Sequence, residues 1–253
     1  MGHSVQPFRA ELSADATWPA EETVPLGPWR LRATRGYSRR ANSVRTAGQD
    51  GTDFDWPNLI ARAEAFYRQR GLPPMFHISP ASVPNDLDKL LAERRYQTVM
   101  NSEVWSADPA EVRNSTIFPR PPGQMVAHEE PDDAWLQCAL DEHIGRIEIR
   151  GQICRRVPKP RAFAAITLAN QAVARALSAV YDGVGWLYCM ATVAEQQRRG
   201  FAGWLLHDSA QWVMDNGAET FYLQVLKDNS AAKALYSKAG FEKRYEYHYR
   251  VLK

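Results

Sequence analysis

Residues 197–202 of the chain read Gln-Arg-Arg-Gly-Phe-Ala, and the segments on either side of this stretch decide the fold. The apolar run of residues 185–193 lies just before it and predicts a strand. Residues 200–216 follow with apolar side chains at helical spacing, and Gly217 is placed to end that helix. A strand that passes through a basic glycine turn into a helix directs unpaired N–H groups and the positive end of the helix dipole at one point. We therefore expect a phosphate or pyrophosphate at this turn.

The side chains of the turn favour the same ligand. Arg198 and Arg199 provide charge-assisted hydrogen-bond donors, while Gly200 and Ala202 keep bulky side chains away from an anion. The alternative interpretation is an ordinary solvated start of a helix, which needs no ligand.

The sequence after the turn predicts three more elements. Residues 220–225 are rich in aromatic and β-branched side chains, which is typical of a strand. Residues 227–230 form a turn with an N-cap, and residues 231–239 predict a short helix that Gly240 ends. The last strand is predicted over residues 241–252.

The region before the turn predicts a three-strand meander. Its strands are expected over residues 163–168, 172–182 and 185–193. Ala169-Asn170 and Asp182-Gly183 are suitable turn residues between them.

This order of elements resembles the GNAT superfamily of acetyl-CoA-dependent N-acetyltransferases. The resemblance rests on the loop motif Gln197-x-x-Gly200-x-Ala202 and on Asn229 with the segment 234–241, Ala-Leu-Tyr-Ser-Lys-Ala-Gly-Phe. The family's loop pattern is Gln/Arg-x-x-Gly-x-Gly/Ala, so Ala202 is an accepted variant. The resemblance covers about residues 163–251 and implies an α+β fold, with a mixed, mostly antiparallel, twisted sheet flanked by helices.

The resemblance implies that acetyl-CoA is the co-substrate. It assigns to the backbone of Ala191 and Val193 the pairing with the pantetheine arm, for which ordinary sheet pairing is the alternative. The loop that would hold the pyrophosphate consists of Gln197, Arg198, Arg199, Gly200, Phe201, Ala202 and Gly203. Gln197 either contacts the cofactor or closes the loop, and Asn229 either bonds the cofactor arm or serves as an N-cap.

The resemblance also implies that Tyr236 is the general acid that protonates the departing coenzyme A thiolate. A phenol has a reference pKa of about 10, so it is protonated at neutral pH and able to donate. The alternative is that Tyr236 packs one face of its helix. The general base stays open among Glu195, Tyr188, Glu148, Glu142 and His143.

Composition sets further limits. The chain has 253 residues, of which 45% are hydrophobic and 24% charged, and this is ordinary for a globular protein. A net charge of +2 does not favour nucleic acid or an anionic membrane as a partner. No apolar run approaches the roughly 18 residues of a membrane span. Three cysteines without metal-ligand spacing predict no metal site and favour the cytoplasm.

The N-terminal half resembles a second, degenerate copy of the same fold. Gly71 ends a predicted helix much as Gly217 does, and Tyr96 occupies the place of Phe241 at nearly the same separation along the chain. Leu91 stands where the other copy has Tyr236.

The N-terminal copy also lacks the loop motif. Residues 53–57, Asp-Phe-Asp-Trp-Pro, stand in its place, and their acidic side chains would repel a pyrophosphate. We therefore do not expect this copy to bind coenzyme A in the usual way. The basic segment 35–44 is predicted as a solvated loop in preference to a site for an acidic ligand.

The predicted organisation has four parts. We expect residues 1–25 to be poorly ordered, residues 26–117 to form the degenerate copy, and the proline-rich residues 118–123 to be a linker. Residues 124–253 would then be the acetyltransferase domain. Within it, residues 131–151 are predicted to be helical and to cover the acceptor side.

The leading hypothesis is acetyl transfer from acetyl-CoA to a primary amine by direct attack in a ternary complex. The alternative is a non-catalytic module that binds or senses acyl-CoA, although the intact Tyr236 argues against it. Transfer of a longer acyl group depends on the room around Met190 and Ala191. The acceptor, a small molecule or a protein amine, and the oligomeric state stay open.

Overall fold

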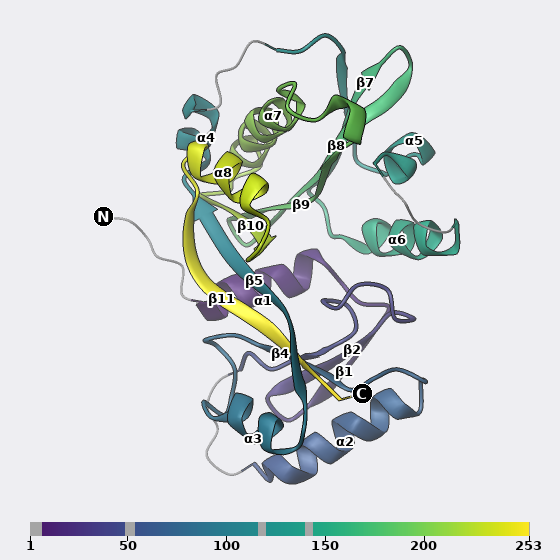
Figure 1. Cartoon of the computed structure of the whole chain (residues 1–253), viewed down its shortest axis with the longest axis vertical. Coiled ribbons are helices and arrows are strands. Elements are labelled where there is room, and N and C mark those ends of the chain that lie inside the picture. The colour runs from purple at the N-terminus through teal and green to yellow at the C-terminus, as the bar shows by residue number, and fades with distance from the viewer. Residues whose placement is uncertain (1–6, 49–53, 116–119, 140–143, 253) are drawn as a thin grey trace. The chain divides into compact units, whose positions relative to one another are not determined.

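The fold is that of a computed structural model, which describes residues 7–48, 54–115, 120–139 and 144–252 (Figure 1). The chain divides into two compact units. Unit 1 contains the residues up to Glu103 together with the segment that begins at Tyr245, and unit 2 contains Val104–Arg244.

The boundaries between the units differ from the expected linker at residues 118–123. They fall inside two long strands, β5 (Gln97–Ala107) and β11 (Glu242–Val251). Each of these two strands contributes residues to both units. The C-terminal segment of the chain therefore belongs to unit 1. Residues 118 and 119 of the expected linker lie outside the described residues.

Unit 2 contains a mixed sheet in the order β5-β10-β9-β8-β7-β6. The strands beside β5 are β6 (Gln124–His128), β7 (Arg161–Leu168), β8 (Gln171–Tyr181), β9 (Val184–Thr192) and β10 (Thr220–Leu226). Strands β6 to β9 pair antiparallel, whereas β9 and β10 pair parallel. The predicted meander is therefore confirmed.

The turns of the meander also agree with the prediction. Ala169, Asn170, Asp182 and Gly183 have φ values of 48°, 64°, 51° and 71°. Two consecutive left-handed residues are what a type I′ hairpin turn requires, and Asn and Gly adopt them at the least cost.

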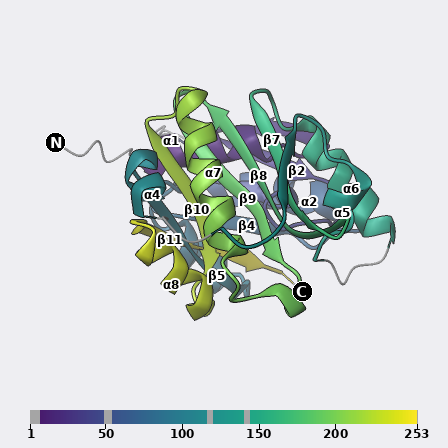
Figure 2. The same ribbon diagram turned by 90° about the horizontal axis from the view of Figure 1, so that it is seen from above.

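Helix α7 (Phe201–Asp215) lies across β8 and β9, as the view from above shows (Figure 2). Gly185 on β9 permits this close packing, because a Cβ at that position would lie 3.0 Å from the Cβ of Val213. The side chains of Phe201, Leu205 and Val213 are buried in the core between helix and sheet.

The remaining helices of unit 2 are short. They are α4 (Pro109–Ser115), α5 (Asp133–Gln137), α6 (Ile144–Arg156), the 3₁₀ turn η1 (Ala194–Gln196) and α8 (Ser230–Lys238). The single helix expected over residues 131–151 is thus two helices, and residues 140–143 between them lie outside the described residues.

Unit 1 repeats the expected order of elements. Its sheet runs β1-β2-β3-β4-β11-β5. The elements are α1 (Pro7–Thr17), β1 (Glu22–Leu26), β2 (Trp29–Ala33), β3 (Val44–Arg45), α2 (Trp56–Arg68), β4 (Met75–Ile78) and α3 (Leu87–Glu93), with β11 antiparallel to β4.

Two expectations about unit 1 are corrected. The first 25 residues are not a poorly ordered segment where the structure describes them, because α1 and β1 form there and α1 buries Ala10, Ala14 and Thr17. The basic segment 35–44 is solvated only in part, because Arg35, Gly36 and Arg39 are exposed whereas residues 41–44 are buried. The buried Asn42 accepts hydrogen bonds from the N–H groups of Thr34 (2.7 Å) and Gly36 (3.0 Å), and it folds the segment around its own amide.

Candidate functional site

The turn between β9 and α7 has the backbone of an anion-binding site. Arg198 and Gly200 both adopt left-handed φ values, 59° and 92°. The carbonyl of Gly200 accepts the first helical bond, from the N–H of Trp204 at 3.0 Å. The N–H groups of residues 201–203 therefore belong to the first turn of α7 and have no partner within the helix. Alternating left-handed residues beside such N–H groups form a concave cradle for an anion.

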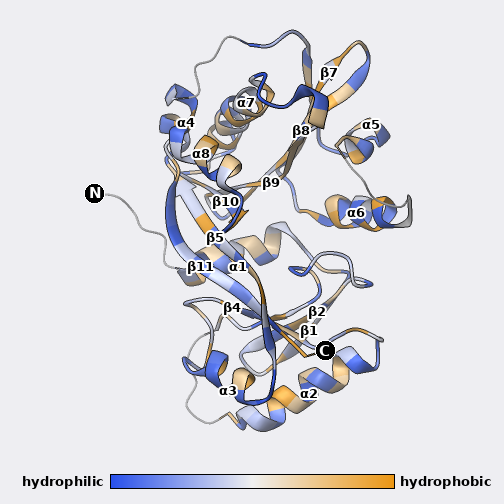
Figure 3. Cartoon of the chain, in the orientation of Figure 1, coloured by the Kyte–Doolittle hydropathy of each residue, from blue (hydrophilic) through white to orange (hydrophobic). Residues whose placement is uncertain are grey.

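The loop side chains are polar and exposed, and the segment before α7 is coloured hydrophilic in Figure 3. Gln197 Nε2 donates to the carbonyl of Thr192 at 3.4 Å, so Gln197 closes the loop. Arg199 donates to the side chain of Gln196. Among the described residues, neither Arg198 nor Arg199 forms an ion pair with a carboxylate. The ring of Phe201 is buried in the core.

The strand before the loop separates from its neighbour near the middle. Parallel pairing of β9 with β10 runs from Val184 opposite Thr220 to Leu187 opposite Leu223, where it ends. The next residues of β9 contain a β-bulge: Tyr188 lies opposite Leu177 and Ala191 opposite Arg175, with Cys189 at a φ of 53° between them. A bulge bends its strand and increases the local twist.

The bulge places Ala191 beyond the last pair of β9 with β10, where its backbone is not part of that ladder. Val193 differs from expectation, because its N–H donates to the carbonyl of Val173 at 2.9 Å. That bond uses the donor which pairing with a cofactor arm would require. The bulge itself was missed, since an apolar run such as 185–193 contains no residue that marks one.

Tyr236 lies in α8 and is 7% exposed. Its ring meets the edge of Phe241 at 5.9 Å between centroids, and burial raises its pKa to about 12. The phenol is therefore protonated throughout the physiological range. Asn229 is the N-cap of this helix, with Oδ1 accepting from the N–H of Ala232 at 3.1 Å.

The structure does not single out a general base. Tyr188 is buried and stacks on Trp186 with ring centroids 5.7 Å apart. Glu148 is exposed and accepts a hydrogen bond from Gln152, and Glu195 is exposed in η1. Glu142 and His143 lie outside the described residues.

The corresponding place in unit 1 is closed by the protein itself. After β3, the hydroxyl of Thr46 donates to the carbonyl of His77, and the carbonyl of Thr46 accepts from the N–H of Val83 at 3.0 Å. Gly48 N–H donates to the carbonyl of Ala81 at 3.3 Å. The loop after β4 thus joins the segment that follows β3.

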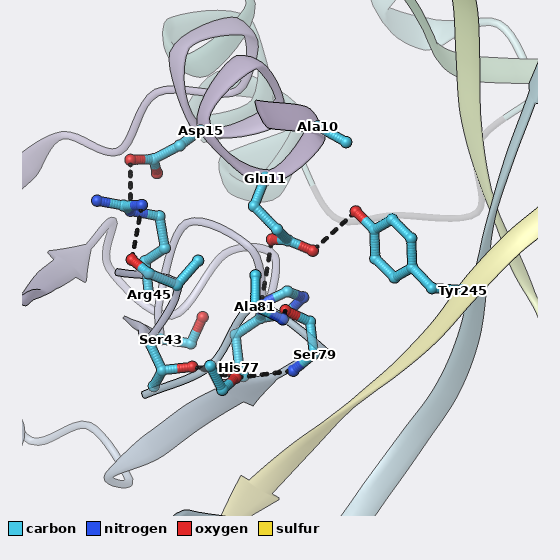
Figure 4. Close-up of polar contacts among 12 residues, drawn as sticks. Ala10, Glu11, Asp15, Ser43, Arg45, His77, Ser79, Ala81 and Tyr245 are labelled. Atoms are coloured by element: carbon cyan, nitrogen blue, oxygen red, sulfur yellow. Dashed lines mark hydrogen bonds and ion pairs between the residues drawn. The ribbon is translucent and has the colours of Figure 1, made fainter. Parts of the chain in front are cut away.

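Unit 1 also contains a buried polar cluster that the sequence did not reveal (Figure 4). Glu11 of α1 accepts from the hydroxyl of Tyr245 at 2.9 Å, and its second oxygen lies 3.4 Å from Nδ1 of His77. Nearby, Asp15 contacts the guanidinium of Arg45 at 3.2 Å. No periodicity or motif marks these residues, because long-range contacts bring them together.

Burial controls protonation in this cluster. It raises the pKa of Glu11 from 4.5 to about 7 and lowers the pKa of His77 well below 6.5. The contact between them is therefore not an ion pair at neutral pH, because the imidazole is uncharged there.

None of the helices in the described ranges is long and apolar enough to cross a bilayer. Within the same ranges, no group of three or more His, Cys, Asp or Glu side chains is arranged to hold a metal ion.

Comparisons with known proteins show the family of the chain. The family described as "Probable histone acetyltransferase Rv0428c C-terminal" matches residues 8–250. The "Uncharacterized N-acetyltransferase YobR" of Bacillus subtilis (strain 168) is 32% identical over 250 residues, which is 96% of this chain and 97% of that protein.

Solved structures share the fold at low identity. A GCN5-related N-acetyltransferase from Kribbella flavida has a TM-score of 0.70 at 16% identity, with 97% of this chain and 95% of the other covered. A tandem GNAT protein from the clavulanic acid biosynthesis pathway has a TM-score of 0.64 at 13% identity, with 83% and 74% covered.

Proposed function

The chain belongs to the Rv0428c acetyltransferase family and is an N-acetyltransferase of GNAT fold, and on this premise we propose that it moves an acetyl group from acetyl-CoA to a primary amine. The observation that carries the proposal is the cradle at residues 197–203, with its two left-handed residues and exposed arginines. Its N–H groups and the guanidinium groups of Arg198 and Arg199 would hold the pyrophosphate.

The residues around the cradle have separate roles in the proposed reaction. When bound, acetyl-CoA supplies the thioester that the amine attacks. The backbone of Ala191, beyond the β9–β10 pairs, would bind the pantetheine arm. The bulge at Cys189 and Met190 interrupts the regular ladder, and N–H groups of the strand there would stabilise the developing negative charge on the thioester oxygen.

Tyr236 would donate the proton that the departing thiolate needs. Its raised pKa keeps the donor protonated, and its buried ring fixes the position of the hydroxyl. The presence of a tyrosine at this position supports catalysis rather than passive binding of an acyl-CoA. We leave the base unassigned.

Unit 1 is proposed to bind no coenzyme A. Thr46, Gly48 and Val83 occupy the equivalent place with their own hydrogen bonds, and the buried Leu91 replaces the tyrosine. Titration calorimetry should accordingly give one acetyl-CoA per chain. The three cysteines form no disulfide in the structure, and two of them are buried, which also supports a location in a reducing compartment.

Thermal unfolding with acetyl-CoA tests the cradle first. At about 100 times its dissociation constant, a ligand adds roughly 2.7 kcal/mol to stability, so the midpoint should rise. Gly200→Glu should abolish this rise, because a carboxylate would occupy the anion site. A panel of amines followed by release of free thiol then tests transfer. Binding without thiol release from any amine would contradict the proposed reaction.

A further inference from the structure

Unit 2 contains a pocket of about 580 Å³ that the cradle residues 197–203 do not line. It lies between α7 and the strands β6, β7 and β8. The walls include Trp204, Trp212, Met125, Ala162, Ala164 and Ser178. The hollow exists because Ala162, Ala164 and Ser178 have small side chains at the place where the sheet faces α7. Its size is typical of sites for small molecules, and its lining combines apolar side chains with polar groups.

A cation of the protein itself sits at the rim of this pocket. The guanidinium of Arg120 lies 5.3 Å from the ring centroid of Trp204 and 3.2 Å from Oδ1 of Asp208. Trp204 Nε1 donates to Oδ2 of Asp208 at 3.0 Å, so the carboxylate also fixes the indole. An aromatic face and a carboxylate held together in this way form a receptor for a positive charge.

The ion pair between Arg120 and Asp208 is weak. Its side chain is 60% exposed, against 28% for Asp208, and ion pairs with such exposure contribute little because water and salt screen them. An outside cation would therefore displace Arg120 at small cost. The pocket beside it would then accept the body of the same molecule.

We propose that this pocket binds an organic cation, an ammonium or guanidinium group on an aryl or alkyl body, whose charged end replaces Arg120 on Trp204 and Asp208. Trp212 and Met125 would contact the apolar body over Ala162 and Ala164. The inference does not depend on acetyl transfer, since none of these residues belongs to the cradle or to α8.

Titration calorimetry of the full chain with 4-phenylbutylamine tests the proposal, with 4-phenylbutyrate as the matched anion. Arg120→Gln removes the competing cation, so the affinity for the amine should increase about fivefold. This is the factor that corresponds to the free energy of one exposed ion pair. Asp208→Asn should weaken it by a similar factor. The affinity for 4-phenylbutyrate should not increase in Arg120→Gln.

A second variant tests whether the amine binds in this pocket or at another site on the protein. Ala164→Leu fills the floor and should weaken binding in proportion to the lost space, while thermal unfolding reports whether the variant is folded. If Arg120→Gln binds the amine no better than the native chain, the pocket is not a cation site. Preference for phenylbutyrate, or equal binding by all variants, overturns the proposal as well.

Discussion

The hydroxyl of Tyr245 donates a 2.9 Å hydrogen bond to Oε1 of Glu11, across 234 positions of the chain. Tyr245 lies on the last strand and Glu11 on the first helix, and both belong to unit 1. The bond therefore joins the two ends of the chain inside one compact unit. It also places a carboxyl group where water cannot solvate its charge, and the stability of unit 1 should depend on pH as a result.

The native chain should lose stability as the pH rises to neutral, and the variant Glu11→Gln should not show this loss. The folded pKa of about 7 lies above the reference value of 4.5, so the folded chain binds the proton more tightly than the unfolded chain. The stabilisation by the protonated form is complete below pH 4.5 and disappears as the pH rises to about 7. Over that window, stability of the native chain relative to Glu11→Gln should fall by on the order of 3 kcal/mol.

Urea denaturation of both proteins at several pH values measures this difference. His77, whose pKa is lowered, acts in the opposite direction and is present in both proteins, so subtraction removes the part of its contribution that does not depend on its contact with Glu11. A difference that stays constant from pH 4.5 to 8 would show that Glu11 is not perturbed.

Tyr236→Phe should retain cofactor binding and lose catalysis. The substitution deletes one hydroxyl and leaves the contact of the ring with Phe241 in place. If the phenol is the general acid, kcat for thiol release should fall about 100-fold or more, while the thermal shift by acetyl-CoA persists. The exposed Tyr181, with Tyr181→Phe, provides the control and should be fully active. An active Tyr236→Phe would assign the proton donor elsewhere.

Gly200→Ala and Gly217→Ala form a matched pair at the two ends of α7. Both glycines have left-handed φ values, 92° and 82°, so each substitution should cost roughly 1 kcal/mol of stability from the backbone alone. A Cβ at Gly217 meets no atom within 4 Å, so no added clash is expected there. Stabilisation by acetyl-CoA should fall in Gly200→Ala alone. Equal losses in the two variants would argue against the cradle.

Asn229 is tested by replacing its amide with a carboxylate. Asp caps helices as well as Asn does, whereas Ala costs about 1 kcal/mol. If capping of α8 is the whole role, Asn229→Asp should keep both stability and acetyl-CoA affinity. If the amide also bonds the cofactor arm, affinity should fall in Asn229→Asp at unchanged stability. Measured urea midpoints and calorimetric affinities distinguish the two roles.

Gly185→Ala should destabilise unit 2 by about 1–3 kcal/mol through overpacking. The new Cβ would lie 3.0 Å from Cβ and 3.1 Å from Cγ1 of Val213, and 3.2 Å from Cβ of Ala218. Val213→Ala removes one of the crowding atoms, Cγ1, so the double variant should lose less than the two single losses added. Additive losses in urea denaturation would show that α7 shifts freely on the strand.

Local patterns were sufficient for much of the fold. The meander was predicted because Ala169-Asn170 and Asp182-Gly183 carry their own turn preference. Residues 200–216 carry both the helical spacing of α7 and its glycine stop. The loop at residues 197–203 could be proposed as an anion site for the same reason, since its glycine and its arginines are neighbours in the chain.

Features that depend on distant residues were not predictable in this way. The bulge at Cys189 follows from the register of β9 on β8, and the donor of Val193 is used by Val173 on the other strand. Order in α1 depends on partners such as Tyr245 at the far end of the chain. The division into units likewise required knowledge of where β5 and β11 pair.

The sequence by itself determined the order of elements, the family and the basic glycine turn, because those are set by preferences of neighbouring residues. Tertiary structure alone decided which backbone donors stay unpaired, which carboxyl is buried beside a phenol, and where Arg120 meets Trp204 and Asp208. The physical reason is that pairing, burial and desolvation depend on what each group contacts after folding, and those contacts join segments that the linear order keeps apart.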